Sequence, residues 1–375
     1  MENTRRPLPL IIDGRALVVI DDIIKEMQEE LDKFIEFAKY TNSIKFSKDV
    51  LFSHEIQANN FIEGYKDDVE TIDEVIHKSG VVKDKEKRQR IINLYNGYKY
   101  ILERKTIDKE TLKELYDILS KKLLSTEDVS NMGEYYRKND VYIFYSNNPD
   151  KFDTGMPSTE IDEYMSMLLE YANTNNSNLS KTELFLKSQI MHFYFVFIHP
   201  YYDINGRTSR TMSMWYLLNN EDFPFIIFNR AIQLNKNKYY KKILESKRLM
   251  NVTSFLKYML EYTREELEKD YIINMIKEST TSNLTSLDFQ TLHYILSMKS
   301  NMTYLDFIEF YNNQNDKKKQ KEIIEMIYSL LEKGIIIEKS ETQKQIAGIN
   351  NHFFTLNPNL FEIDPQMIKK IQLHK

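Results

Sequence analysis

The segment HPYYDINGRTSR, residues 199–210, decides how this chain is interpreted. It follows the apolar run IMHFYFVFI, which has the composition of a buried helix. Pro200 disfavours the helical conformation of the residue before it, so this helix is expected to end at His199. A second helix is expected to begin near Asn205 and Gly206, and its free N–H groups and positive dipole end favour an anion. The sequence therefore places His199 at a junction between two helices, next to a predicted anion site.

The other residue types in the segment suit phosphate chemistry. Arg207 and Arg210 are three residues apart, so both guanidinium groups lie on one face of the first helical turns. Asp203 offers a hard oxygen ligand for the Mg²⁺ that accompanies nucleotide phosphates. His199 is the nearby group that can accept a proton near neutral pH. Each feature alone is usually structural, and it is their occurrence together that indicates a functional site.

Length and composition restrict the classes of fold and function that the chain can have. The chain has 375 residues, enough for two or three domains at about 150 residues each. Only 9 Gly and 8 Pro argue for a mostly helical chain. The absence of cysteine excludes disulfides, Cys-ligated metals and a thiol nucleophile. The net charge of −5 gives no whole-chain case for nucleic-acid binding. Because no signal peptide or membrane-length apolar run is found, a cytoplasmic protein without membrane contact is expected.

Periodicity predicts the order of elements along the chain. Helices are expected over most of it, at 21–40, 48–63, 68–78, 84–104, 109–124, 159–172, 181–199, 206–219, 236–248 and 251–278. Residues 133–147 are rich in aromatic and β-branched residues and precede Asn-Pro, so they predict a strand or hairpin. After a linker near 279–286, three further helices at 286–299, 303–312 and 318–333 and a two-stranded ribbon form a winged-helix-like pattern.

The central segment resembles the signature of the Fic family, H-P-F-x-[D/E]-G-N-G-R-x-x-R. The matching residues are His199, Pro200, Asp203, Asn205, Gly206, Arg207 and Arg210. Tyr201 replaces the usual Phe, and Ile204 stands where the family has the first Gly of its loop. Isoleucine adopts positive φ poorly, so the phosphate-binding loop is expected to be less ideal here, and Ile204→Gly is expected to raise activity or ATP affinity.

Three other segments also resemble family motifs. The flap pattern of the family is similar to a set of residues spread over 133–143, namely Gly133, Tyr136, Arg137, Val141 and Ile143. NKYYKKIL resembles the helix that lines the nucleoside pocket, with Tyr239 and Tyr240 as counterparts. NNFIEG, residues 59–64, resembles the inhibitory helix motif, with Glu63 and Gly64 matching and Asn59 in place of Ser or Thr. The resemblance covers roughly residues 10–275.

The resemblance implies a mainly α protein. It would have a Fic-fold helical core with a short β-hairpin flap and a small C-terminal winged-helix domain. The implied domains are an N-terminal helical region with the inhibitory helix at 1–105, the core at 106–278 and the winged helix at 283–360.

The implied activity is transfer of AMP from ATP to a Ser, Thr or Tyr hydroxyl of a target protein. His199 would deprotonate that hydroxyl, and Asp203 would hold Mg²⁺. Glu63 would inhibit by pairing with Arg210, in the place of the γ-phosphate. The nucleotide would be bound by Asp203, Ile204, Asn205, Gly206, Arg207, Thr208, Ser209, Arg210, Tyr239, Tyr240, Ile143 and Phe144.

Other functions stay open at this point. A related enzyme could transfer another group, or could remove AMP, with Glu63 activating water. A DNA-binding regulator with a degenerate core is a second alternative, which only Ile204 favours, and a pure interaction module is a third. The expected partner is a protein with a modifiable hydroxyl, including this chain itself. DNA contact through the winged helix, where KKKQK (317–321) lies, and a homodimer are further partners considered.

Overall fold

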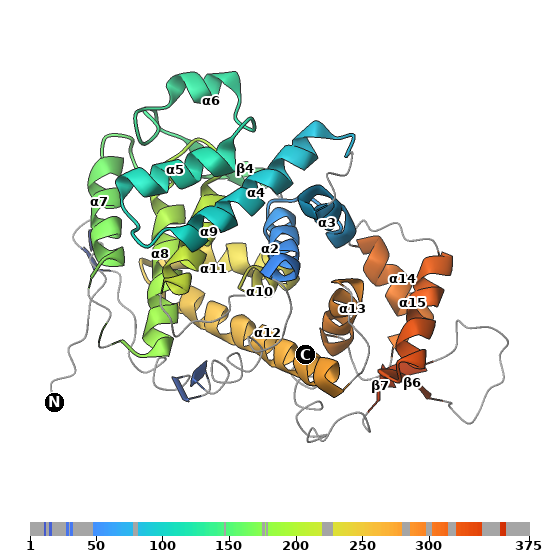
Figure 1. Cartoon of the computed structure of the whole chain (residues 1–375). Helices are drawn as coiled ribbons and strands as arrows, with labels where there is room; N and C mark the ends of the chain where they lie inside the picture. Colours follow the sequence, from blue (N-terminus) through green and yellow to red (C-terminus); the bar gives the residue numbers. More distant parts are fainter. Residues whose placement is uncertain are drawn as a thin grey trace. The chain divides into compact units, whose positions relative to one another are not determined.

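The computed structural model describes most of the helical part of the chain (Figure 1). The described residues are 11–12, 15–16, 28–29, 31–32, 48–77, 82–145, 148–174, 177, 179–219, 228–279, 286–297, 302–313, 320–339 and 353–357. They form two compact units, one of residues 1–36 and 75–264 and one of residues 37–74 and 265–375. The boundaries at 105 and 283 are those that the resemblance implies, whereas these units follow contacts in space, and the two divisions are not the same.

Two adjacent helices form the centre of the first unit. α8 (Lys181–Ile198) packs against α9 (Asn205–Leu218), and α7 (Ile161–Ala172) packs on α8. α4 (Lys85–Glu103) and α5 (Lys109–Ser120) pack on each other and on α9. The remaining elements of this unit are the strand pair β1 (Ile11–Ile12) and β2 (Arg15–Ala16), α6 (Thr126–Asn131), α10 (Phe228–Leu234), α11 (Lys236–Leu249) and the first part of α12 (Thr253–Ser279).

Local signals in the sequence explain why these helices begin where they do. The Ser180 hydroxyl accepts the Glu183 N–H at 3.2 Å, and the Glu183 carboxylate accepts the Ser180 N–H at 2.8 Å. This capping box satisfies two N–H groups that the start of α8 leaves without helical partners. Asp108 and Thr111 make the same arrangement at the start of α5. The helices predicted at 84–104, 159–172, 181–199 and 206–219 are confirmed within two residues at each end.

The predicted strand forms one arm of a hairpin. β3 (Tyr142–Tyr145) pairs antiparallel with β4 (Asn148–Thr154), and Ile143 lies opposite Asp153. The prediction was wrong about residues 133–141, which form a turn with an isolated bridge between Met132 and Arg137. The reason is that backbone groups of this stretch are bound elsewhere: the Arg137 N–H donates to the Pro200 carbonyl, and the Gly133 N–H donates to the Tyr136 carbonyl. We call the β3–β4 hairpin the flap.

The second unit combines an N-terminal and a C-terminal part of the chain. Its N-terminal part holds α2 (Lys48–Ile62) and most of α3 (Val69–His77). α2 ends at Gly64 as predicted, because Gly64 has a φ of +96° and its N–H donates to the Phe61 carbonyl at 3.0 Å. The Asn60 amide donates to the Asp67 carboxylate at 2.8 Å and fixes the chain after this turn.

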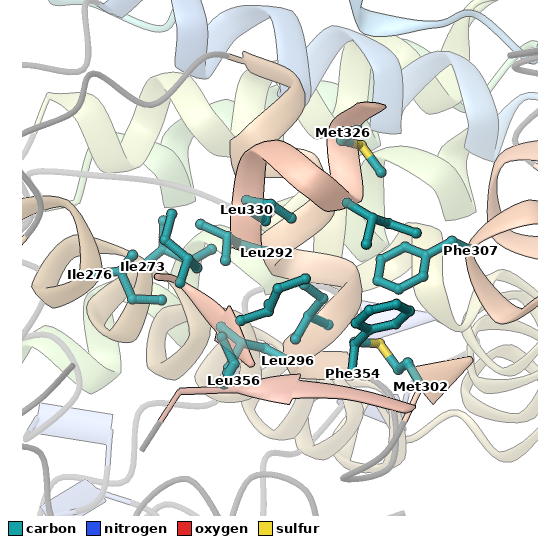
Figure 2. Close-up of a cluster of buried hydrophobic side chains, with 14 of the residues drawn as sticks. Ile273, Ile276, Leu292, Leu296, Met302, Phe307, Met326, Leu330, Phe354 and Leu356 are labelled. Carbon is teal, nitrogen blue, oxygen red and sulfur yellow. The ribbon is translucent and has the colours of Figure 1, made fainter. Parts of the chain in front are cut away.

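The C-terminal part of the second unit contains the three helices and the ribbon that the sequence predicts, with one added strand. Its elements are α13 (Ser286–Ser297), β5 (Met302–Thr303), α14 (Tyr304–Asn313), α15 (Gln320–Glu332), β6 (Ile336–Lys339) and β7 (Phe353–Leu356). The sheet order is β5-β7-β6, with both pairs antiparallel. Figure 2 shows the apolar core of this part, in which side chains from the end of α12, such as Ile273 and Ile276, join those of Leu292, Phe307 and Phe354.

A buried ion network also joins the end of α12 to α13. The Lys269 ammonium lies 2.5 Å from the Glu266 carboxylate, and both side chains are almost fully buried. The two ring nitrogens of His293 lie 3.3 Å from Glu266 and 2.7 Å from Asp270. Each buried charge therefore has an opposite or hydrogen-bonding partner, as burial requires. Among the described helices of both units, none is long and apolar enough to cross a membrane.

Candidate active site

His199 lies at the junction that the sequence predicts. It caps the end of α8 with a φ of 55° and a ψ of 61°, and its N–H donates to the Phe195 carbonyl at 2.9 Å. A left-handed conformation costs a non-glycine residue about 1–2 kcal/mol, so it persists only where the surroundings impose it. The half-buried imidazole has Nδ1 3.4 Å from the Val196 carbonyl oxygen. Because a carbonyl can only accept, this contact places the proton on Nδ1 and leaves the lone pair on Nε2.

The surroundings keep His199 uncharged. Burial lowers the pKa of His199 to about 4, although the Val196 carbonyl opposes the shift. The positive charges of Lys247 and Arg137 lower the pKa further, and Asp153 raises it. At neutral pH the imidazole is therefore unprotonated and can accept a proton.

The flap and its flanking residues supply the hydrogen bonds that the end of α8 needs. A helix leaves its last carbonyl groups without partners. Here the Ile198 carbonyl accepts the Met156 N–H at 3.1 Å, and the Pro200 carbonyl accepts the Arg137 N–H at 3.0 Å. The His199 carbonyl accepts the Arg137 side-chain Nε–H at 2.8 Å. Three consecutive carbonyls around the candidate base are thus bound by residues on either side of the flap.

Arg137 is the centre of this arrangement. Its buried guanidinium also donates to the Asn139 carbonyl at 2.5 Å and to the Met156 carbonyl. Burial lowers the pKa of Arg137. Gly155 leaves room for this packing, since a Cβ there would lie 2.6 Å from the Arg137 Nη2 and 3.2 Å from the His199 Cβ. The flap pattern contains Arg137, but sequence reasoning gave it no place at the site, and no local signal indicated Gly155.

The loop after Pro200 is closed by its own side chains. The Asn205 amide accepts the Tyr201 N–H at 3.0 Å and donates to the Tyr201 carbonyl at 2.8 Å. Asn205 is among the residues expected to bind the nucleotide, and in this structure both ends of its amide are engaged with the loop backbone. The exposed Asp203 accepts the Ile204 N–H on Oδ1 at 2.6 Å. Its second oxygen has no hydrogen bond to any described residue, so it is available to a cation.

Two arginines are buried in the first turns of α9. Arg207 and Arg210 are 4% and 1% exposed. Among the residues that the structure describes, the Nε of Arg207 has no hydrogen-bond partner. Burying an unmatched guanidinium donor is costly, and an anion satisfies it best. The Thr208 and Ser209 hydroxyls instead donate to helix carbonyls at 2.8 and 2.9 Å, so their predicted nucleotide contacts stay predictions.

The remaining predicted residues fall in different places. Tyr239 is buried, and its hydroxyl lies 2.8 Å from His192 Nε2, while Tyr240 is half-buried beside it. Ile143 is half-buried on β3, whereas the side chain of Phe144 lies outside the described residues. Glu63 follows α2 in the second unit and is half-buried. The structure thus brings His199, Arg137 and the loop residues together within the first unit.

Ile204 carries the largest departure from the family pattern. Its φ is +65°, so the loop adopts the left-handed conformation that a glycine would favour, despite the isoleucine. The side chain is 2% exposed. Replacement by glycine would relieve about 1–2 kcal/mol of backbone cost but would lose about 1.5–3 kcal/mol of side-chain burial. The burial of the Ile204 side chain therefore offsets the free-energy cost of its left-handed backbone.

We accordingly expect Ile204→Gly to lower the free energy of unfolding by about 1 kcal/mol and to leave ATP affinity near that of the wild type. This replaces the gain in affinity that the sequence alone suggests. Denaturant unfolding and calorimetric titration with ATP measure the two quantities. A several-fold tighter binding of ATP by the variant would show that the isoleucine does hold the loop away from its best conformation.

Tyr201 offers a second test of the loop. Its ring stacks on Tyr116 with centroids 3.5 Å apart, and its buried hydroxyl has no partner among the described residues. Because a buried hydroxyl without a hydrogen bond costs about 1–3 kcal/mol, Tyr201→Phe should be at least as stable as the wild type. Tyr239→Phe is the matched control, since its hydroxyl contacts His192, and it should lose about 1 kcal/mol. Equal losses in both variants would contradict this account.

The first unit thus contains a buried helical pair with a histidine at its junction, arginines on the second helix and a hairpin bound to the junction. Residues 106–217 match the family model described as the Fic/DOC family. The match covers this segment of the chain, and the predicted core bounds of 106–278 stay a prediction. This class of domain supports a Fic-type transferase as the coarse functional assignment.

Solved structures agree on the fold. A Fic family protein from Desulfovibrio desulfuricans G20 is 17% identical, with a TM-score of 0.57, and the match covers 94% of this chain and 98% of that one. Fic-1 from C. elegans is 15% identical with a TM-score of 0.52, covering 69% and 73%. A Fic domain containing signaling protein from Bacteroides thetaiotaomicron VPI-5482 is 13% identical with a TM-score of 0.51, covering 67% and 96%.

Proposed function

We propose that this protein is an adenylyltransferase that moves AMP from ATP to a Ser, Thr or Tyr hydroxyl of a target protein. The observation that carries the proposal is the left-handed junction at His199, which precedes a helix whose first turns bury Arg207 and Arg210. Nε2 of His199 accepts the proton of the target hydroxyl while that oxygen bonds to the α-phosphorus. The bond from the α-phosphorus to the bridging oxygen breaks, and pyrophosphate leaves.

The start of α9 is suited to the charge of the triphosphate. The N–H groups of its first turn have no partners within the helix, and the dipole favours negative charge there. Arg207 holds the β-phosphate and Arg210 the γ-phosphate in this proposal. Such transfers depend mostly on alignment and charge neutralisation, which fixed donors provide. The phosphates also add negative charge near His199, which raises its pKa towards the working range of a general base.

The donor set fits Mg²⁺ only together with a nucleotide. Among the described residues, no group of three or more acidic or histidine side chains could hold a metal by itself. Mg²⁺ in nucleotide sites is commonly bound through one or two carboxylates and the substrate phosphates. Asp203 provides one exposed carboxylate at the start of α9. When bound there, the metal would neutralise phosphate charge, and Asp203 would orient it.

Labelled ATP tests the activity. Incubation with Mg²⁺ and ATP labelled at the α-phosphorus should leave label on protein, whereas label at the γ-phosphorus should not. Label retained from the γ-phosphorus would indicate a kinase. Loss of AMP from a previously modified protein would indicate removal. No label from either position, in wild type and in Glu63→Gly, would contradict the proposal and favour a binding function.

Glu63 is proposed as an inhibitory residue. Its carboxylate would compete with the ATP γ-phosphate for the planar guanidinium of Arg210. We expect Glu63→Gly, and Glu63→Gln as a variant that keeps the turn at Gly64, to increase the initial rate of AMP incorporation. A gain of about 5–150-fold corresponds to usual coupling energies. Asn59→Ser, which restores the family hydroxyl, should be slowest. Equal rates in all variants would show that this helix does not regulate the site.

DNA contact through the C-terminal part stays a prediction. Residues 317–319 of the basic run lie outside the described residues. The described exposed positions of α15 are Lys321, Glu322, Glu325, Tyr328 and Glu332. Because carboxylates outnumber the lysine on this face, its charge does not favour phosphate contact.

A further inference from the structure

Lys247 links three elements around the candidate base. It lies in the last turn of α11, where a positive charge is favoured by the helix dipole. Its ammonium group lies 5.2 Å from the centre of the Phe197 ring in the last turns of α8, within the range of a cation–π contact. It also forms an ion pair with Asp153 of β4. A single side chain thus contacts α8 and the flap from α11.

Asp153 joins the Lys247 ammonium group to the backbone of the flap. One carboxylate oxygen pairs with Lys247, and the other accepts the Thr154 N–H at 2.9 Å. Directly after Thr154, Gly155 packs against His199 and Met156 donates to the Ile198 carbonyl. The Lys247 side chain is 11% exposed and that of Asp153 is 29% exposed, so the pair is shielded from water on most sides.

We propose that the Lys247–Asp153 pair is a positioning element that fixes the second flap strand against α8 and so sets where a target segment lies relative to His199. The proposal rests on the proposed function, because a target hydroxyl must reach His199. It concerns residues that are neither part of the signature segment nor bound to the phosphates. Arg137 fixes one side of the flap, and this pair fixes the other.

Substitutions at the two residues should loosen the flap equally. Lys247→Met and Asp153→Asn should speed hydrogen–deuterium exchange of residues 151–156 about threefold, the scale of a partly exposed ion pair. Lys242→Met is the matched control, since Lys242 lies on the same helix and forms an ion pair with Glu245 at 2.9 Å that does not involve the flap.

The pKa of His199 gives a second readout that a loosened flap alone would not produce. Lys247 lowers this pKa and Asp153 raises it. Arg137, the other charged group that faces the imidazole, is the same in every variant. The titration of His199 followed by NMR should therefore move up in Lys247→Met and down in Asp153→Asn. Both measurements are made without nucleotide or target, so they stand even if AMP transfer is not found.

Steady-state kinetics test whether the Lys247–Asp153 pair affects binding of the protein target. Where transfer is measured, both single variants should raise KM for the protein target several-fold and leave KM for ATP unchanged. The proposal is overturned if exchange of 151–156 and the titration of His199 in both variants match those of Lys242→Met.

Discussion

His199→Ala is expected to abolish AMP transfer while ATP still binds. Removal of a general base typically costs about 10²–10⁴-fold in rate. His199 is held at the junction by hydrogen bonds through its backbone, which alanine retains, and phosphate affinity resides in Arg207, Arg210 and the start of α9. The initial rate of incorporation from α-labelled ATP measures the loss, and calorimetry with ATP measures the retained binding.

His192→Gln is the control for this experiment. His192 is the other buried histidine near the site, and it contacts Gln189 and Tyr239 inside the core. Its substitution should reduce stability more than transfer. The pH profile adds a further check, because the base must be unprotonated and the pKa of His199 in the free protein is lowered to about 4. The value of kcat/KM should therefore stay flat as the pH falls through 6.5. Transfer by His199→Ala within a few-fold of wild type would remove His199 from the mechanism.

The site residues that could be predicted are those whose conformation is determined by their neighbours in the sequence. Pro200 ends α8 through its own ring, and Asn205 and Gly206 begin α9 five and six residues later, so the junction follows from adjacent residues. The sequence indicated that isoleucine at position 204 adopts positive φ poorly, yet the structure has a φ of +65° there. The motif does not predict that the isoleucine side chain is buried. This burial offsets the backbone cost of the left-handed conformation, and it depends on packing against residues distant in the sequence.

The site contacts that the sequence did not predict are made between residues far apart in the chain. Arg137 reaches the His199 carbonyl across 62 residues, and Lys247 reaches Asp153 across 94. Neither pairing leaves a periodic or compositional signal in one sequence. The same holds for the irregular stretch 133–141, where aromatic and β-branched residues predicted a strand. The hydrogen bond from the Arg137 N–H to the distant Pro200 carbonyl overrides that local preference, as tertiary contacts commonly do.

Arg137→Met is the second change with a large expected effect. Methionine keeps much of the volume but donates no hydrogen bond, so the carbonyls of His199, Met156 and Asn139 lose the donors they have from the guanidinium. Buried carbonyls without partners cost about 1–3 kcal/mol each, so we expect a loss of roughly 3 kcal/mol in unfolding free energy. Denaturant unfolding measures this loss.

The effect on rate should exceed what stability alone explains. The guanidinium fixes the carbonyl of His199 itself, and a displacement of about 1 Å in a catalytic group can cost 10²-fold. Arg137→Lys keeps the charge but lacks the planar fork that serves several carbonyls at once, so it should fall between wild type and Arg137→Met in both quantities. Arg248→Met, the same change at an exposed position of α11, should alter neither. If Arg137→Met matched Arg248→Met in stability and in transfer rate, the junction would hold its geometry without the guanidinium, and the left-handed turn at His199 would have to be fixed by Pro200 and the Met156 N–H alone.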